Sequence, residues 1–544
     1  MVLARLKRLP IPHLLLLLWL SALVLTLVGL GGVPLRDWDE GIVARVALET
    51  SLRPWPDKLM PTYWWEAYRN KPPGLHLLIA ACIGLWRQFS QAPAQALPPE
   101  WVLRIAPAFV STALVPLLGL IQWRLRPGDR GSALATAAVA LTLLPLARHG
   151  RLVMLDGCQL VAMAGLWLTL LQARGRSWSL VAWGVGAGLA SSGMLLLKAP
   201  VAVPVLLGSL LLRSLDRDLR GRQLILLLIG VLLGLLPGLG WHVAHWLLRG
   251  PEALQMWWGQ GFSRIQNSME GHQGGPLEPL LEMVEGGGPW LLLWPLGIAM
   301  AWRQRRGRWG RWSLGLSLLT AAMVLPLQTQ LPWYSLLLWP PFCLVCGPVL
   351  AALVERPVRQ SFPLIAIARK VPVAWRWIGV LLLLCALLTG LGGPPELFFY
   401  GNLAAVLGLA LVVGSSLLLR EGTSPRLGGA ITLVAGCWLS LLLLMASPFW
   451  LWELNETWSA PAAARMLTNQ ETATVVAVPE GERPSLSWYA GRRIMGGPRA
   501  IRKALNRDEA VALISPTPLE SAQLACERLN ASGELRIYHC IRRS

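Results

Sequence analysis

Long apolar runs separated by short arginine-rich connections constrain this chain more than any other feature. The first run follows Arg5, Lys7 and Arg8, and similar runs recur as far as residue 448. Many approach the roughly 20 apolar residues that an α-helix needs to cross a bilayer. Charged residues make up only 14% of the 544 residues, too few to cover the surface of a soluble protein of this length. The sequence therefore predicts an all-α polytopic membrane protein.

The basic residues predict how the chain is oriented. Arginines gather in short connections, as at 123–131, 213–222 and 303–311. Short cytoplasmic loops of membrane proteins carry such an excess, which also accounts for the net charge of +20 without a nucleic-acid partner. With these connections and the N-terminus cytoplasmic, we predict about thirteen transmembrane helices and an external C-terminus. The predicted spans are 12–31, 102–122, 132–147, 157–173, 178–197, 199–213, 223–247, 288–302, 313–328, 332–352, 373–391, 400–419 and 428–448.

One further apolar run, 74–89, does not fit this alternation. As a full span it would place every later basic connection on the wrong side of the membrane. We therefore expect a juxtamembrane or re-entrant segment within one large external loop, 32–101. A second long external loop is expected at 248–287.

After residue 450 the charge rises and the long apolar runs stop. ATVVAVP, AVALISP and LRIYHCI predict short strands, and PRAIRKALN and SPTPLESAQLACERLN predict helices. We expect a small external α/β domain at 450–544 after a transmembrane domain at 1–449. Cys526 and Cys540 fall in this domain and could pair in an oxidising compartment, but the sequence does not place them close together.

Two aspartates stand at predicted external ends of helices. The apolar spacing of DWDEGIVARVALETSL predicts an amphipathic helix on the membrane surface. Asp39 either caps this helix, with Glu40 favourably placed in the first turn, or faces a cavity. Asp156 precedes the span 157–173 and has the same two interpretations. Two carboxylates in one cavity could serve as a general base and an orienting group.

Cations collect on the same predicted face. In YWWEAYRNKPPG, two prolines follow Lys71, fixing the backbone and removing two amide donors. A lysine beside a membrane commonly snorkels to the interface, but a rigidly placed ammonium suits a phosphate. Arg45, Arg104, Lys198 and Arg264 are further cations on this face. Singly each would anchor to lipid headgroups; together they indicate an outward-facing anion site. A lipid-borne phosphate donor fits such a site, which is separated from cytoplasmic nucleotides.

An ordered set of motifs carries a resemblance. RDWDEG, YRNKPPG, LRIAPAF, ARHGRLVMLD, LLLKAPVAVP and TQLPWYSLLLWPP follow one another over roughly residues 10–350. Together they resemble the GT-C superfamily of polyprenyl-phosphate-dependent glycosyltransferases, glycosyltransferase family 39-like members in particular. That branch contains the bacterial aminoarabinose–lipid A transferases and the dolichyl-phosphate-mannose protein mannosyltransferases.

The resemblance implies a GT-C fold and an activity. Such enzymes transfer a sugar from a polyprenyl phosphate to a lipid, glycan or protein acceptor on the external face, with inversion at the anomeric carbon. The chain would then be a multi-pass protein of a bacterial inner membrane with a periplasmic active site. Asp39 would be the general base and Lys71 would hold the leaving phosphate. The full implied set is Asp39, Glu40 and Asp156 as catalytic residues, and Lys71, Arg45 and Arg264 around the donor phosphate.

Metal and cysteine chemistry are not expected. Aminoarabinose transferases carry Glu just before the motif lysine, where this chain has Asn70, a poor zinc ligand. No ligand cluster surrounds His272, so we predict no metal or other cofactor, and the departure disfavours aminoarabinose as the sugar. Cys343 and Cys346 form a CxxC within an apolar span, where cysteine usually packs as a small hydrophobe.

Three alternatives remain open at the level of sequence. A transporter or flippase of lipid-linked substrates would also place charges near a membrane cavity, although transporter sites usually lie near the midplane and their halves often repeat. A GT-C protein that only binds lipid is the second alternative. The third is an enzyme that takes an oligosaccharide from a lipid pyrophosphate.

Overall fold

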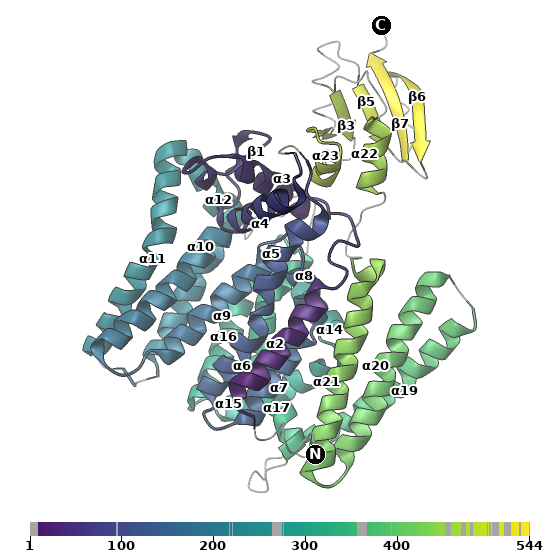
Figure 1. The fold of residues 1–544 in the computed structure, drawn as a ribbon. Coiled ribbons are helices and arrows are strands. Elements are labelled where there is room, and N and C mark those ends of the chain that lie inside the picture. The colour runs from purple at the N-terminus through teal and green to yellow at the C-terminus, as the bar shows by residue number, and fades with distance from the viewer. Residues whose placement is uncertain are drawn as a thin grey trace.

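Long helices run side by side through the molecule, shorter helices cross one end, and a small β-containing domain lies beyond them (Figure 1). We call the end with this domain the upper end, and the end with the N-terminus the lower end. The structure is a computed structural model. It describes residues 9–93, 96–216, 218–219, 221–263, 275, 277–355, 367–392, 394–451, 459–468, 475–478, 482–497, 499, 502, 511–515, 524–532 and 535–542.

Seven helical stretches among the described residues are long and apolar enough to cross a membrane, and a bent pair, α7–α8, would be an eighth. They confirm an all-α polytopic membrane fold. The seven are α5–α6 (Glu100–Thr112, Leu114–Leu125), α10 (Ser177–Ser214), α11 (Gly221–Arg249), η5–α17 (Pro332–Leu338, Trp339–Glu355), α19 (Val371–Gly390), α20 (Pro395–Leu419) and α21 (Thr423–Ala446).

Shorter helices complete the bundle. Each of the thirteen predicted spans overlaps one helix, one helix pair or one leg of a helix, and the number of membrane crossings stays a prediction. The α7–α8 pair is bent by 59°, a break that the sequence analysis did not anticipate. The shorter helices are α2 (Ile11–Leu27), α7 (Arg130–Leu141), α8 (Leu144–Gly150), α9 (Asp156–Gln172), η4 (Gly288–Leu293), α15 (Trp294–Arg303) and α16 (Arg308–Val324).

Helix α10 consists of two legs that meet at Lys198, whose φ of −141° and ψ of 82° are not helical. Along the first leg, the contacts with α9 move backwards as the chain advances, so the two are antiparallel. Along the second leg, the contacts advance together, so the chain has turned back at Lys198. The contacts are Gly186 with Thr169 and Gly193 with Ala162 on the first leg, and Lys198 with Asp156 and Arg213 with Leu170 on the second.

Helix α11 packs against the first leg of α10 almost backbone to backbone. A Cβ on Gly188 would lie 2.2 Å from the Val231 carbonyl oxygen, and one on Gly234 would lie 2.2 Å from that of Val185. Small residues allow helices to approach this closely inside a membrane. The two form the arm on the left of Figure 1.

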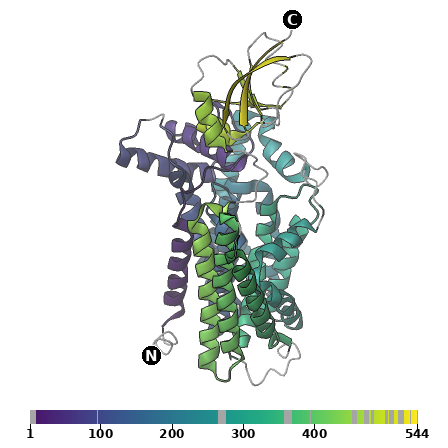
Figure 2. The same cartoon turned by 90° about the vertical axis from the view of Figure 1, so that its right-hand side faces the viewer.

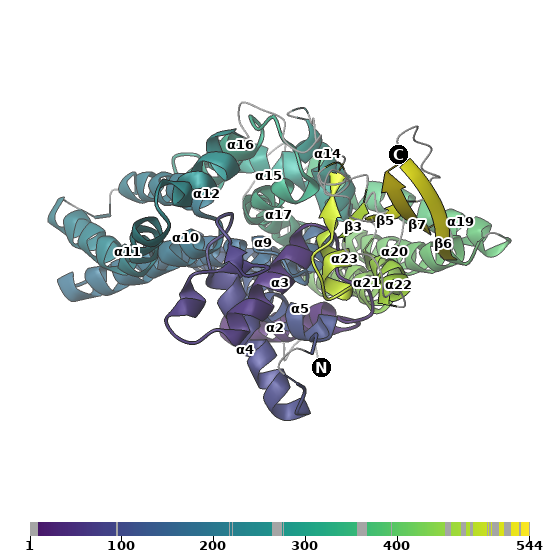
Figure 3. The same cartoon turned by 90° about the horizontal axis from the view of Figure 1, so that it is seen from above.

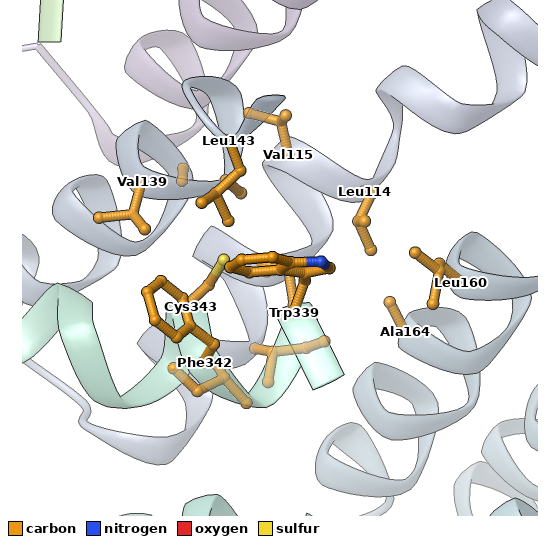
Figure 4. Close-up of a cluster of buried hydrophobic side chains, with 14 of the residues drawn as sticks. Leu114, Val115, Val139, Leu143, Leu160, Ala164, Trp339, Phe342 and Cys343 are labelled. Carbon is orange, nitrogen blue, oxygen red and sulfur yellow. The ribbon is translucent and has the colours of Figure 1, made fainter. Parts of the chain in front are cut away.

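The centre of the bundle is apolar and close-packed around α17. Trp339 is fully buried, with Leu114, Val115 and Leu160 near its ring, and Cys343 lies beside it (Figure 4). Cys343 and Cys346 are both fully buried. This agrees with the interpretation of the CxxC as two small hydrophobes.

The arginine-rich connections meet at the lower end. Arg126, after α6, donates to the Gln304 side chain between α15 and α16, at 3.3 Å. Asp216, after α10, accepts hydrogen bonds from Arg308 and Arg311 at the start of α16. Connections that the sequence analysis placed on one side of the membrane therefore lie together.

The upper end is a layer of short elements. Helix α4, the apolar run 74–89, lies across this end instead of along the bundle (Figures 1 and 3). Helix α3 was predicted to rest on the membrane surface, but Val43, Ala44 and Val46 are buried because α4, the β1–β2 hairpin and helix α23 of the C-terminal domain pack against it. The layer contains α3 (Asp39–Leu52), η1 (Asp57–Leu59), β1 (Thr62–Tyr63), β2 (Glu66–Ala67), α4 (Gly74–Ser90), η2 (Pro251–Leu254), α12 (Gln255–Trp257), η3 (Trp258–Phe262), α14 (Glu278–Gly286) and η6 (Pro448–Trp450).

The C-terminal domain is a small α/β unit that stands on this layer (Figure 2). Its five-stranded sheet has the order β4-β3-β5-β7-β6, with β3 parallel to β4 and β5 and the other pairs antiparallel. The three predicted strands coincide with β3, β5 and β7. The elements are α22 (Ala460–Thr468), β3 (Val475–Val478), α23 (Pro484–Tyr489), β4 (Met495–Gly496), β5 (Val511–Ser515), β6 (Leu524–Ser532) and β7 (Leu535–Arg542).

One predicted helix of this domain is wrong. Residues 524–530, expected to be helical, belong to strand β6, because pairing with β7 along its whole length outweighs local helix propensity. Cys526 faces Cys540 in this pairing and the two form a disulfide, which the sequence had left open. Residues 516–523, and nearly all of the helix predicted at PRAIRKALN, lie outside the described residues.

Candidate active site at the upper end of the bundle

Asp39 is the first residue of α3 and follows an unusual turn. Trp38 has φ 57° and ψ −82°, and the Asp39 N–H donates to the Asp37 carbonyl at 3.0 Å. This is a γ-turn with positive φ at its centre, the rarer and more strained of the two γ-turn forms. The N-cap position is Trp38, without a side-chain cap, so Asp39 does not cap the helix.

Four other charged groups act on Asp39. Its enclosed position raises the pKa of the carboxyl, Asp156 raises it further, and Lys71, Arg36 and Lys198 lower it. These residues come from the turn before α3, the loop before α4, the start of α9 and the kink of α10. The fold therefore brings three of the predicted site residues, Asp39, Lys71 and Asp156, into one electrostatic cluster.

Lys198 sits where α10 turns, and this position gives it an acidic partner. Its Nζ lies 3.0 Å from Asp156 Oδ1 and 5.1 Å from the centre of the Tyr334 ring. Asp156 is the first residue of α9 and the N-cap is Leu155, so Asp156 does not cap this helix either. Both aspartates were also interpreted as possible caps, and the structure does not support that interpretation.

The Lys-Pro-Pro turn packs directly on the α10 kink. A Cβ on Gly74, just after the prolines, would lie 2.6 Å from the Leu196 carbonyl oxygen. His76 Nδ1 lies 3.1 Å from the Pro72 carbonyl. Burial lowers the pKa of His76 to about 4, so its ring is neutral at neutral pH and Nδ1–H donates to that carbonyl. These contacts fix the backbone that carries Lys71.

Glu40 has a different environment from Asp39. It is fully buried, and its carboxylate binds Arg104 through two hydrogen bonds of 2.8 and 2.7 Å. It also accepts the backbone N–H groups of Arg36 and Val153. Burial alone would raise the pKa of Glu40, but the charge and hydrogen bonds of Arg104 more than offset this and hold the pKa below its usual value.

Arg45 is engaged elsewhere on α3. Its Nε donates to Glu49 at 2.7 Å, and its guanidinium lies 3.7 Å from the centre of the Trp64 ring. Glu49 in turn accepts from Thr62 and from the Trp65 N–H. Arg45 thus helps to hold the β1–β2 hairpin. Arg104, counted among the external cations, is likewise occupied by Glu40.

Two residues named in the sequence analysis, Arg264 and His272, lie outside the described residues. Across the part of the chain that the structure describes, no group of three or more His, Cys, Asp or Glu side chains is placed to bind a metal. The absence of a metal stays a prediction.

A cavity of about 410 Å³ opens beside the Asp156–Lys198 pair. Pockets for small molecules and cofactors have volumes of this order. Its walls are mostly apolar and come from the second leg of α10, the end of α16 and η5. The wall includes Pro200, Pro204, Trp257, Met323, Trp333 and Tyr334.

Sequence reasoning missed several residues of this region. Trp333 and Tyr334 were quoted within TQLPWYSLLLWPP without a role, yet Tyr334 lies over Lys198 and Trp333 lies 4.9 Å from the Arg36 guanidinium. The aromatic pair directly after a proline was the available signal. His76 offered no signal, because its role depends on burial.

Comparison with known proteins finds the same architecture. No family model and no curated protein sequence matches the chain. Two crystal structures of ArnT from Cupriavidus metallidurans, one bound to undecaprenyl phosphate and one in the apo state, each superpose with a TM-score of 0.68 and 16% identity over 97% of both chains. An oligosaccharyltransferase from Archaeoglobus fulgidus, in complex with zinc and sulfate, aligns over 89% of this chain and 62% of its own at 13% identity and a TM-score of 0.41.

At 16% identity, the likeness to ArnT is a likeness of fold. It extends over the bundle and the C-terminal domain alike, since 97% of this chain is covered. The chain therefore has the same fold as the two ArnT structures, and this agrees with the fold that its ordered motifs predict.

Proposed function

We propose that this chain is a membrane glycosyltransferase that moves a sugar from a polyprenyl-phosphate donor to a lipid, glycan or protein acceptor. One observation carries the proposal: Asp39, Lys71, Asp156 and Lys198 form one charged cluster beside an apolar cavity. A polyprenyl phosphate has the matching form, with a charged head and a long apolar chain. One of the ArnT structures with this fold holds undecaprenyl phosphate.

The donor fits the site in one direction. Its phosphate would bind between Lys71 and Lys198, whose ammonium groups both act on the Asp39 carboxyl. The first isoprene units would lie against Pro200, Pro204 and Met323. The rest of the chain would extend into lipid. In this arrangement we expect the anomeric carbon to lie next to Asp39.

The reaction would be a single displacement. Asp39 accepts the proton of the acceptor, and the acceptor oxygen bonds to the anomeric carbon from the side opposite the phosphate. The bond from that carbon to the phosphate oxygen breaks, and its electron pair leaves with the polyprenyl phosphate. Lys71 and Lys198 stabilise the charge that develops on the leaving phosphate, where electrostatic catalysis acts most strongly. The anomeric configuration inverts.

The remaining predicted residues receive supporting roles in this proposal. Asp156 orients Lys198 through their 3.0 Å ion pair. Glu40 positions α3 through Arg104, and Arg45 positions the β1–β2 hairpin. Arg264 stays a proposed phosphate ligand on the strength of the motif resemblance alone.

A transporter of lipid-linked substrates is the rival proposal. Transporters usually bind their substrate near the middle of the membrane, on broken helices. Here the cluster lies at the upper end, next to α3 and the Lys-Pro-Pro turn, and this position supports the transferase.

The test uses purified full-length protein in nanodiscs with a panel of radiolabelled undecaprenyl-phosphate sugars. We expect Asp39→Asn to lower turnover by roughly 10²- to 10⁴-fold, the usual contribution of a general base. Binding of undecaprenyl phosphate should survive in this variant. Lys71→Ala should weaken that binding as well as slow turnover, because the lysine contacts the phosphate.

Matched controls lie on the same external loop. Asp57→Asn and Lys58→Ala make the same chemical changes, and Lys58 lies over the Trp55 ring. Both should behave as wild type. If no polyprenyl-phosphate sugar binds or turns over, or if Asp39→Asn keeps full turnover, the proposal is wrong and the transporter becomes the leading hypothesis.

A further inference from the structure

Side chains of the C-terminal domain bind the turn that carries Asp39. Asp37, only 6% exposed, accepts hydrogen bonds from the Ser485 N–H at 3.0 Å, from the Ser485 hydroxyl and from Arg483. A buried carboxylate with this many donors is strongly held. Only one residue, Trp38, separates Asp37 from the proposed catalytic base, Asp39.

The contact continues along the first turn of α3. A Cβ on Gly41 would lie 2.5 Å from the Ser485 backbone nitrogen and 2.6 Å from the Pro484 carbonyl carbon. Backbone therefore meets backbone here, and only glycine leaves the space. At the other end of α23, the Tyr489 hydroxyl accepts from the Leu35 N–H and donates to Glu100, both at 2.7 Å.

These contacts are made to a segment with a strained backbone. The positive-φ γ-turn at Trp38 persists only if its surroundings hold it, and such strain tends to occur at functional sites. The first residue of this turn, Asp37, is held by Arg483 and Ser485. On the other side of Asp39, Glu40 is held by Arg104. Asp39 thus lies between two buried and hydrogen-bonded carboxylates, Asp37 and Glu40. The residues that bind Asp37 belong to the C-terminal domain.

We infer that the C-terminal domain is a positioning element of the active site: Arg483 and Ser485 hold Asp37, and thereby hold Asp39 in its place beside Lys71, Asp156 and Lys198. The inference rests on the proposed function. Arg483 and Ser485 act through the turn at 37–39 and do not touch the substrate. The C-terminal domain therefore has a role in the site without contributing a catalytic residue.

The test compares three disruptive variants of the full-length protein and one rescue variant, Ser485→Thr, with one control. Gly41→Ala wedges the two backbones apart, Asp37→Asn removes the charge that Arg483 binds, and Ser485→Ala removes one hydroxyl. Arg493→Gln is the control, because it removes another contact of the same domain, the exposed 3.0 Å pair with Glu66. Alanine is normally a better helix former than glycine. A loss of kcat in Gly41→Ala would therefore reflect the separation of the two backbones and not a weaker helix.

We expect kcat to fall at least tenfold in Gly41→Ala and Asp37→Asn, and several-fold in Ser485→Ala. Affinity for undecaprenyl phosphate should not change, because Lys71 and Lys198 are carried by other elements. Ser485→Thr, which keeps the hydroxyl, should restore kcat, and Arg493→Gln should match wild type. A purely structural role would lower kcat and donor binding together with the melting temperature.

The outcomes separate this inference from the proposed function. If Asp39→Asn abolishes turnover while Gly41→Ala, Asp37→Asn and Ser485→Ala keep wild-type kcat, the inference is overturned and the transferase stands. If Gly41→Ala fails to fold, Ser485→Ala decides, since losing one hydroxyl leaves the backbone contact intact. Turnover that is absent in wild type or intact in Asp39→Asn removes the proposed function, and the inference with it.

Discussion

At the scale of single residues, the charges around Asp39 set the pH at which it can accept a proton. Arg36 lowers the pKa of Asp39 and Asp156 raises it. A general base works in its ionised form, so turnover should rise with pH through this pKa. We expect Arg36→Gln to move the acidic limb of the kcat profile to higher pH, and Asp156→Asn to move it to lower pH. The measurement is kcat against pH for wild type and both variants.

The opposite signs make this pair informative. Neither substitution touches the carboxyl itself, and a general loss of stability would lower kcat at every pH without moving the limb. Glu66→Gln, an exposed carboxylate of the hairpin, is the neutral control. Limbs that move in the same direction, or a limb that stays fixed in both variants, would contradict Asp39 as the group that titrates.

Residues were predictable from sequence where a motif carried them. Asp39, Lys71 and Asp156 were named from their motifs, and the fold brings them together. Asp37 was not, because its partners Arg483 and Ser485 lie 446 and 448 residues away along the chain. Local spacing contains no information about such a contact.

At the scale of elements, the α10–α11 contact depends on glycines, which have no side chain to separate the helices. The Gly188 position leaves no room for a Cβ beside the Val231 carbonyl. We expect Gly188→Val to force the helices apart and to cost about 1–3 kcal/mol, the usual penalty of overpacking. The melting temperature in detergent should fall. Because Lys198 ends the same leg of α10, donor binding should weaken too.

Gly240→Val on α11 is the matched control. A Cβ there would meet nothing within 4 Å, so the same added volume points into open space. Equal losses in both variants would show that valine disturbs these helices through propensity alone. An unchanged melting temperature in Gly188→Val would contradict the close packing itself.

Elements were predictable where one physical signal dominated. Apolar runs located every bundle helix among the described residues, because a segment in lipid must satisfy its own backbone hydrogen bonds. In the C-terminal domain the signal is weaker, and pairing with β7 made residues 524–530 a strand despite their helix-like sequence. The burial of α3 was also missed, because helix α23, which covers it, is distant in sequence.

At the scale of the whole molecule, the arginine-rich connections and the candidate active site lie at opposite ends. The connections with Arg126, Asp216 and Arg308 meet at the lower end, and the Asp39 cluster lies at the upper end under the C-terminal domain. The alternation of predicted loops anticipated this separation. It did not anticipate that the domain would be continuous with the site.

The orientation of these two ends is itself testable. The positive-inside rule predicts that the arginine-rich lower end faces the cytoplasm and the upper end faces out. Replacing Cys82 and Cys385, the free thiols that are not buried, with serine removes the native cysteines that a maleimide could label. In intact bacterial spheroplasts a membrane-impermeant maleimide should label Asp57→Cys at the upper end and leave Arg305→Cys at the lower end unlabelled. Permeabilised cells should label both, which shows that each thiol can react. Labelling of Arg305→Cys alone in intact cells would reverse the orientation and place the active site on the cytoplasmic side, where nucleotide-activated sugars compete as donors.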